Sequence, residues 1–419
     1  MNIKFRLTIL SFLQFFVWGA WLITIAVYWF STKQWGGAEF GAVFSTMGIA
    51  SIFMPALIGI IADRWVNAEK LYGVLHFLYG GSLLLMPSLV NPDQFFWVML
   101  LAMLFYMPTI ALSNSIAYNV LKNTGNDVLK DFPPIRVWGT IGFIVAMWVT
   151  NLTGSKDSAD QFYIAAVVAF ILAIYAFTLP ACPPQNKIPK DAPLSEKLGL
   201  NAFSLFKDYK MALFFSFSML LGAALQLTNM YGDTFLSDFA NDPHYADSFV
   251  VKRSTIIMSI SQISETVFIL AIPFFLKRYG IKKVMLISMF AWVLRFLLLG
   301  YGTPEGIGLV FIIVSCIVYG MAFDFFNISG SLFVEGSTDY KIRSSAQGVF
   351  MMMTNGFGAV MGSLVSGWMI DAYFTHPDGG KMWHEIWLVF ALYAFVIAIA
   401  FWVLFKHKHS PEDLKTITH

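Results

Sequence analysis

The chain has 419 residues, of which 58% are hydrophobic and 12% are charged, with a mean hydropathy of +0.67 and a formal net charge of +2. This composition lies outside the usual range of soluble globular proteins and indicates an integral membrane protein. The small net charge argues against nucleic acid as a partner. With only two cysteines, Cys182 and Cys316, a disulfide framework is not expected.

Segments of about 20 mostly apolar residues, the length needed to cross a membrane as a helix, occur twelve times along the chain. The first is too long for a removable signal peptide and lacks a small-residue cleavage site, so we predict that it is a span. An all-α integral membrane protein with 12 transmembrane helices is therefore expected. The segments are 8–30, 41–62, 71–91, 95–119, 137–155, 161–181, 211–232, 254–276, 284–301, 306–334, 344–370 and 387–405.

The longest polar and proline-rich stretch, CPPQNKIPKDAPLSEKLGL, separates the sixth segment from the seventh. It divides the chain into two six-helix halves. We predict an N-terminal bundle at 1–181, a cytoplasmic linker at 182–210, a C-terminal bundle at 211–406 and a cytoplasmic tail at 407–419.

Lysine and arginine gather on the cytoplasmic side of membrane proteins. If the N-terminus is inside, 21 of the 27 basic residues lie in inner loops and tails. Arg295 falls within the ninth segment, and the outer loops hold only Lys33, Lys156, Lys252, Arg253 and Lys381. Both termini are therefore predicted to be cytoplasmic.

Three features recur in the same order in both halves. The loop GIIADRWVNAEK after the second segment corresponds to FFLKRYGIKKVM after the eighth, Asn114 corresponds to Asn327, and Arg136 corresponds to Arg343, each arginine opening a fifth helix. This order predicts two halves in parallel repeat about a pseudo-two-fold axis, the plan of the major facilitator fold.

The loop GIIADRW resembles the signature of that superfamily, in which Asp-Arg follows a glycine after three residues. The matching positions are Gly59, Asp63 and Arg64, whereas VNA at 66–68 replaces the basic residues that normally close the motif. The resemblance implies a charge-paired gating latch on the inner face. A solvated loop with a charge at each membrane edge is the alternative.

Few ionisable residues lie inside the predicted spans. Each costs about 2.5–3.5 kcal/mol on insertion scales, so such residues usually face a cavity or one another and serve function. They are Glu265, Asp324, Arg136 and Arg295. Arg295, near the outer end of its helix, is expected to extend toward water in a structural role.

Helical spacing groups these residues with amides, hydroxyls and aromatic rings on single faces. The groups are Gln262 with Glu265; Gln226 with Asn229; Asp324, Asn327 and Ser331 flanked by Tyr319 and Phe323; Arg136 with Thr140 and Phe143; and Gln14 with Trp18 and Trp21. We predict that each helix turns one polar stripe inward. Trp18 and Trp21 fit simple packing equally well.

A cavity walled by amides, one or two carboxylates, an arginine and aromatic faces suits a flat, neutral solute with many hydrogen-bonding groups, such as a nucleoside. A sugar has similar needs and is the nearest alternative. A receptor without transport activity is disfavoured because the chain has no sizeable soluble signalling domain. An enzyme is not predicted, since the sequence has no phosphate-binding glycine loop, metal-ligand cluster or nucleophile elbow.

Long runs of the chain resemble the bacterial nucleoside:proton symporters of the major facilitator superfamily, the nucleoside permease and xanthosine permease group. These runs are DFPPIRVWGTIGFIVAMW, LQLTNMYGDTFL, SISQISETVFIL, IPFFLKRYGIKKVM and AFDFFNISGS. The resemblance implies nucleoside uptake with protons across the bacterial inner membrane, by a chain that needs no cofactor and usually works as a monomer. It assigns substrate or proton roles to Arg136, Thr140, Phe143, Gln226, Asn229, Gln262, Glu265, Tyr319 and Asp324.

A carboxylate in a span can exchange protons near neutral pH because desolvation disfavours its charged form. Asp324 or Glu265 is therefore expected to bind the coupled proton before the substrate binds between the halves and the halves rock. Glu265 could instead accept ribose hydroxyls. Asp324 could also form a permanent ion pair with Arg136. The residues do not decide between these alternatives.

Overall fold

The structure is a computed structural model that describes residues 2–184, 200–338, 342–377 and 379–407. In these ranges the regular elements are helices, and the one β-type pairing is an isolated bridge between Thr375 and Lys381. The chain divides into two compact units, Met1–Leu198 and Gly199–His419. Most of the predicted linker and nearly all of the predicted tail lie outside the described residues.

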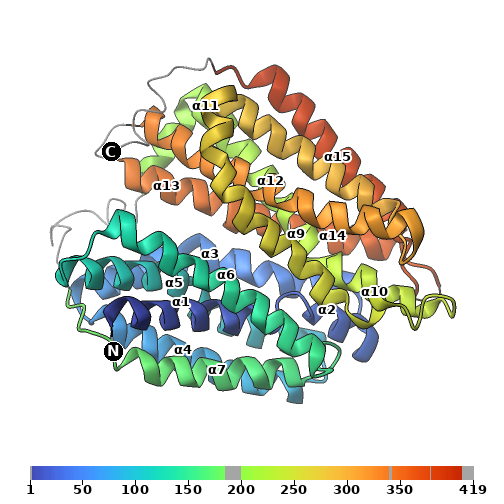
Figure 1. Ribbon diagram of the computed structural model, residues 1–419, viewed down its shortest axis with the longest axis horizontal. Coiled ribbons are helices and arrows are strands. Elements are labelled where there is room, and N and C mark those ends of the chain that lie inside the picture. The colour runs from blue at the N-terminus through green and yellow to red at the C-terminus, as the bar shows by residue number, and fades with distance from the viewer. Residues whose placement is uncertain (1, 185–199, 339–341, 378, 408–419) are drawn as a thin grey trace. The chain divides into compact units, whose positions relative to one another are not determined.

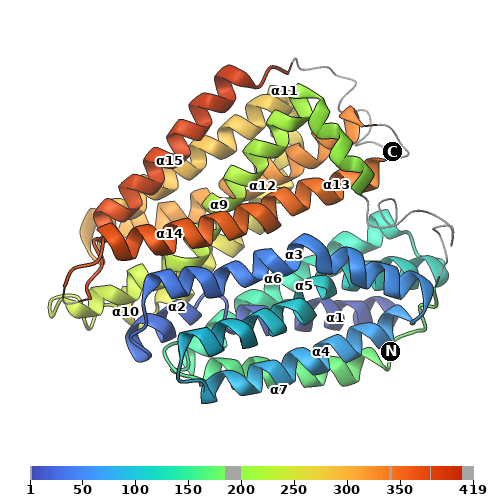
Figure 2. The ribbon, with the colours of Figure 1, turned by 180° about the vertical axis from the view of Figure 1, so that it is seen from behind.

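The first unit is a bundle in which α1 packs against α6 and α7, α3 against α5, and α4 against α5 and α7 (Figures 1 and 2). Its elements are α1 (Ile3–Gly19), α2 (Ile25–Val27), the π-helix η1 (Tyr28–Thr32), α3 (Gly37–Arg64), α4 (Ala68–Leu85), the 3-10 helix η2 (Met86–Ser88), α5 (Pro92–Asn123), α6 (Val128–Leu152) and α7 (Asp160–Ala176).

In the second unit, α11 packs against α12 and α15, while α9 packs against α14 and the π-helix η5 (Figures 1 and 2). The elements are the 3-10 helices η3 (Leu200–Lys207) and η4 (Phe239–Asn241), α9 (Tyr209–Asp238), α10 (Phe249–Lys252), α11 (Ser254–Gly300), α12 (Gly306–Ser337), α13 (Arg343–Met351), η5 (Met352–Gly358), α14 (Ala359–Tyr373) and α15 (Trp383–Leu404).

Helix α11 contains the eighth and ninth predicted segments. Its 47 residues would span about 70 Å as one straight helix, more than twice the hydrocarbon thickness of a bilayer. The helix is interrupted at Gly280, where φ is 77° and ψ is 167°. Side chains disfavour this region, so glycine allows the chain to turn between two helices at a single residue.

Eight helical stretches in the described residues are long and apolar enough to cross a membrane. The prediction of an all-helical, multi-pass membrane protein is therefore confirmed, while the number twelve stays a prediction. The stretches are Gly37–Arg64, Pro92–Asn123, Lys130–Leu152, Tyr209–Asn241, Ser254–Gly300, Gly306–Ser337, Ser345–Tyr373 and Trp383–Leu404.

The first predicted segment, 8–30, is not one helix, because α1 ends at Gly19 and a turn at 20–24 separates it from α2. Other differences from the predicted segments lie at helix ends. Helix α6 begins at Val128 and includes Pro133 and Pro134. Arg136 therefore lies inside the helix and does not open it. Arg343 does begin α13. The predicted correspondence of these two arginines as helix openers is therefore wrong.

Candidate functional site

In the first unit, α6 carries Arg136, Thr140 and Phe143 on one face, supported by aromatic residues of α1. The Arg136 guanidinium lies over the Phe15 ring, 4.1 Å from its centroid. The Phe143 ring, 8% exposed, meets the Trp18 ring edge-on at 6.1 Å. This contact depends on Gly142, where a Cβ would lie 2.1 Å from the carbonyl oxygen of Phe12. Close approach of α1 thus orients this stripe.

Gln14 belongs to a different environment from the one predicted for it. Its amide is fully buried, accepts a hydrogen bond from the Tyr72 hydroxyl and donates one to Thr109 Oγ1 at 3.0 Å. The Tyr106 hydroxyl donates to the backbone carbonyl oxygen of Gln14 at 2.9 Å. Gln14 therefore ties α1 to α4 and α5 inside the unit.

The two tryptophans of this predicted group have different surroundings: Trp18 lies in α1, and Trp21 lies in the turn that follows it. Trp21 is buried and donates from Nε1 to the Tyr79 hydroxyl at 2.7 Å, which makes it a structural residue. Trp18 contacts both Tyr106, at 5.7 Å between ring centroids, and Phe143. Of the predicted group Gln14, Trp18 and Trp21, Trp18 is thus the member shown in contact with the α6 stripe.

In the second unit, Tyr319 on α12 is the centre of the predicted polar group. Its hydroxyl shares a hydrogen bond with Gln262 of α11, and Glu265, Asp324 and Arg295 act on it electrostatically. Its ring stacks on that of Phe323, with the centroids 6.3 Å apart and the planes 12° from parallel. The structure therefore brings these predicted residues together on two adjacent helices.

Helices α11 and α12 approach closely at this group. The Ser264 hydroxyl donates to the carbonyl of Ile317, and a Cβ at Gly320 would lie 2.6 Å from the carbonyl oxygen of Ser264. Glycine at 320 is thus needed for the contact. Asp324, one turn further along α12, is 5% exposed, whereas Glu265 is only half-buried.

Helix α9 contributes Gln226 and Asn229. Gln226 is 8% exposed, and in the described structure its Oε1 is buried without a hydrogen-bond partner, so this acceptor is available. The same face continues to Asp233, which is 1% exposed. Asp233 is not among the predicted site residues, because the predicted span ended at residue 232. The i, i+3, i+7 spacing from Gln226, carried one residue further, would have found it.

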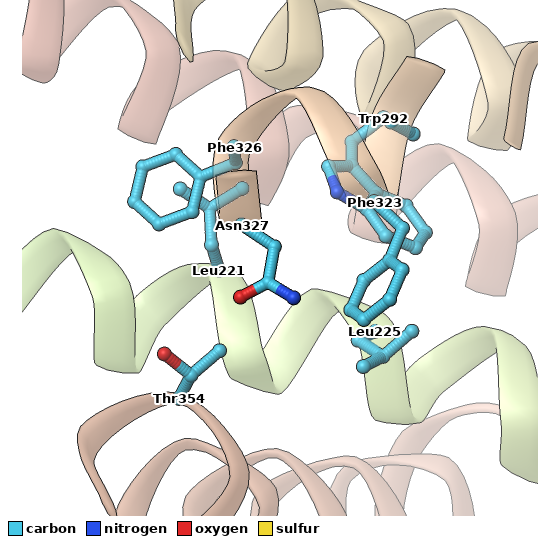
Figure 3. A pocket seen from close by; sticks show the side chains of 8 residues that line it. Leu221, Leu225, Trp292, Phe323, Phe326, Asn327 and Thr354 are labelled. Carbon is cyan, nitrogen blue, oxygen red and sulfur yellow. The ribbon is translucent and has the colours of Figure 1, made fainter. Parts of the chain in front are cut away.

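Asn327 lies at a small cavity within the second unit (Figure 3). In the figure its amide lies between Phe323 of α12, Leu225 of α9 and Thr354 of η5. The volume of about 10 Å³ is room for about one water molecule. Asn327 also lines a larger hollow of about 280 Å³, together with Ser331 and Gln347. Asn327 thus borders both spaces.

The residues of the predicted gating loop are helical. Gly59 and Asp63 lie in the last turns of α3, and Arg64 is its final residue. Glu69, in the first turn of α4, is 3% exposed, and its carboxylate accepts a hydrogen bond from the backbone N–H of Cys182 at 2.8 Å. Burial, together with the Glu69 carboxylate, raises the pKa of the Cys182 thiol to about 12. The start of the predicted linker is therefore fastened to the start of α4.

The expectation that Arg295 reaches toward water is wrong. Its side chain is fully buried and its guanidinium lies over the Tyr319 ring, 4.7 Å from the centroid. The position faces the interior of the unit, where the guanidinium donates hydrogen bonds to Thr228 Oγ1, Ser261 Oγ and the carbonyl oxygen of Ser315.

Apolar helices long enough to cross a membrane that carry buried amides, carboxylates and an arginine are typical of multi-pass membrane proteins of the solute-transporter class. The sequence pattern of the family described as "Nucleoside H+ symporter" matches residues 1–410. The chain belongs to this family.

Known relatives agree with this assignment over their full lengths. The nucleoside permease NupG of Escherichia coli (strain K12) is 52% identical over 421 residues, covering 100% of both chains. The xanthosine permease of the same strain is also 52% identical, with the same coverage. A crystal structure of the nucleoside transporter NupG superimposes with a TM-score of 0.91, covering 97% of this chain and 100% of that chain.

Proposed function

We propose that this protein takes up nucleosides together with protons across the bacterial inner membrane by alternating access. The observation that carries the proposal is the polar group around Tyr319, where an amide, carboxylates and stacked aromatic rings lie together on helices that can cross a membrane. Family membership supports nucleosides over sugars as the solute. Aromatic faces can hold the base, and the amides and acids can pair with base edges and ribose hydroxyls.

The proposed substrate contacts come from both units. The first unit contributes Arg136, Thr140 and Phe143; the second contributes Gln226, Asn229, Gln262, Glu265, Tyr319, Phe323 and Asn327. Asp324 or Glu265 carries the coupled proton. Gly59, Asp63 and Arg64 belong to a gate at the inner face.

The proposal extends to the form of the whole protein. It crosses the membrane twelve times as two repeated six-helix halves, with both termini in the cytoplasm, and works as a monomer surrounded by lipid. The proton gradient drives uptake, so the protein needs no cofactor and catalyses no chemical reaction.

The test is uptake of labelled uridine, adenosine and xanthosine by cells that express the protein, compared with cells carrying an empty vector. We expect saturable accumulation of at least one nucleoside, abolished by a protonophore. Absence of nucleoside accumulation would contradict the proposal. Uptake of labelled glucose or lactose instead would favour a sugar symporter.

A further inference from the structure

Arg295 is a fully buried cation in the second unit, at a position that the proposed substrate contacts do not include. Its Nη1 donates to the carbonyl of Ser315 at 2.7 Å and, at the long limit of 3.3 Å, to Ser261 Oγ. Its Nε lies 3.4 Å from Thr228 Oγ1. One side chain therefore joins α9, both halves of α11, and α12.

Each of these contacts adjoins a proposed substrate contact. Thr228 directly precedes Asn229 on α9, and Ser261 directly precedes Gln262 on α11. Ser315 lies one turn before Tyr319 on α12, and the guanidinium itself lies over the Tyr319 ring. Cation–π contact restricts the ring to an orientation in which its face meets the cation. Arg295 thus supports three helices where they carry the proposed contacts.

The charge of Arg295 is not explained by an ion pair. In the described ranges the ion pairs involve other residues, and Nη2 of Arg295 is buried without a hydrogen-bond partner. A buried cation that lacks a carboxylate partner destabilises a fold relative to an apolar residue of similar size. Packing alone therefore favours methionine or leucine here.

We propose that Arg295 is a positioning residue for nucleoside binding, which holds the Tyr319 ring and its hydrogen bond with Gln262 in the orientation that the substrate requires. This inference rests on the proposed function. It places Arg295 outside direct substrate contact, so its replacement weakens binding through Tyr319.

The test is a double-mutant cycle with Arg295→Met, Tyr319→Leu and the double variant, measured as KM and maximal rate of nucleoside uptake. We expect each single substitution to raise KM about tenfold, and the double variant to be no weaker than the worse single variant, because both remove one arrangement. Arg295→Lys, which keeps a cation over the ring, is expected to recover part of the loss. Lys283→Met, at an exposed position of the same helix, is the matched control and leaves KM unchanged.

A merely structural role gives different results. If Arg295 only stabilises the fold, its replacement lowers the amount of protein in the membrane and the maximal rate but leaves KM unchanged. The losses of uptake in the two single variants then multiply in the double variant. That pattern would overturn the inference. If Arg295→Met does not reach the membrane, Thr228→Val and Ser261→Ala each remove one hydrogen bond and keep the charge. We then expect KM to rise about twofold in each, and an unchanged KM in both contradicts the proposal. Failure of nucleoside uptake by the unaltered protein would refute the proposed function itself.

Discussion

Asp324 and Glu265 show how two carboxylates of one polar group can differ in surroundings. Both act electrostatically on the same tyrosine, Tyr319, but Asp324 is almost fully buried on α12 and Glu265 is half-buried on α11. A buried carboxylate is the better candidate for a proton that must be carried, whereas a part-exposed one can accept solute hydroxyls.

Neutral substitutions separate these two roles. Asp324→Asn and Glu265→Gln keep the shape of each side chain but cannot exchange a proton, so a variant that has lost the coupling residue still exchanges nucleoside across the membrane without concentrating it. We expect this behaviour in one of the two, measured as accumulation in cells and as counterflow in vesicles. Glu335→Gln, on α12 but in a part-exposed ion pair with Arg343, is the control and retains accumulation. If both variants concentrate substrate, neither acid carries the proton.

Residue spacing predicted much of this grouping, for a physical reason. A helical face repeats every three to four residues, so Gln262 with Glu265, and Tyr319 with Phe323, could be assigned to one stripe each from the sequence. Spacing along one helix does not tell which neighbour the stripe faces. Gln14 and Arg295 were misassigned on that account, since their environments depend on contacts with other helices.

Close approach between elements is the corresponding feature at the scale of helices. Helix α9 meets the π-helix η5 at Gly222, where a Cβ would lie 1.9 Å from the carbonyl oxygen of Thr354. A π-helix widens the helical turn, and this one begins at Met352 and ends at Gly358. The apolar pattern is the same for an α-helix and a π-helix, so it predicted one uninterrupted helix over 344–370.

This contact makes Gly222 intolerant of even one methyl group. We expect Gly222→Ala to lower the midpoint temperature of thermal unfolding of the purified protein, with a loss of about 1–3 kcal/mol, because the elements must move apart. The matched control is Gly81→Ala in α4, where the added Cβ meets nothing within 4 Å. Helix propensity then favours alanine, so the control unfolds at the same or a higher temperature. Equal effects in both variants would show that the close contact carries no stability.

At the scale of the whole molecule, hydropathy predicted the all-helical, membrane-spanning architecture. Most apolar segments overlap a helix because a bilayer leaves a spanning chain few alternatives to internal hydrogen bonding. Their ends were predicted less well: α6 starts earlier through Pro133 and Pro134, and α9 runs on past Asp233. Polar residues at helix ends lower hydropathy without ending the helix.

The distribution of lysine and arginine predicts the orientation of the protein in the membrane. Green fluorescent protein fused to either terminus is expected to fluoresce, and alkaline phosphatase fused to either terminus to be inactive, because both ends are predicted to lie in the cytoplasm. Phosphatase inserted after Gly154, an exposed turn between α6 and α7, serves as the control and is expected to be active. Active phosphatase at either terminus would contradict the predicted orientation.

The single-residue turn at Gly280 divides α11 into two helical arms. Helix runs up to this residue and resumes directly after it, so the two arms are joined without a loop. Gln262 and Glu265 are on one arm and Arg295 is on the other. The Arg295 guanidinium donates to Ser261 Oγ, one residue before Gln262, so a hydrogen bond as well as the turn fixes one arm against the other.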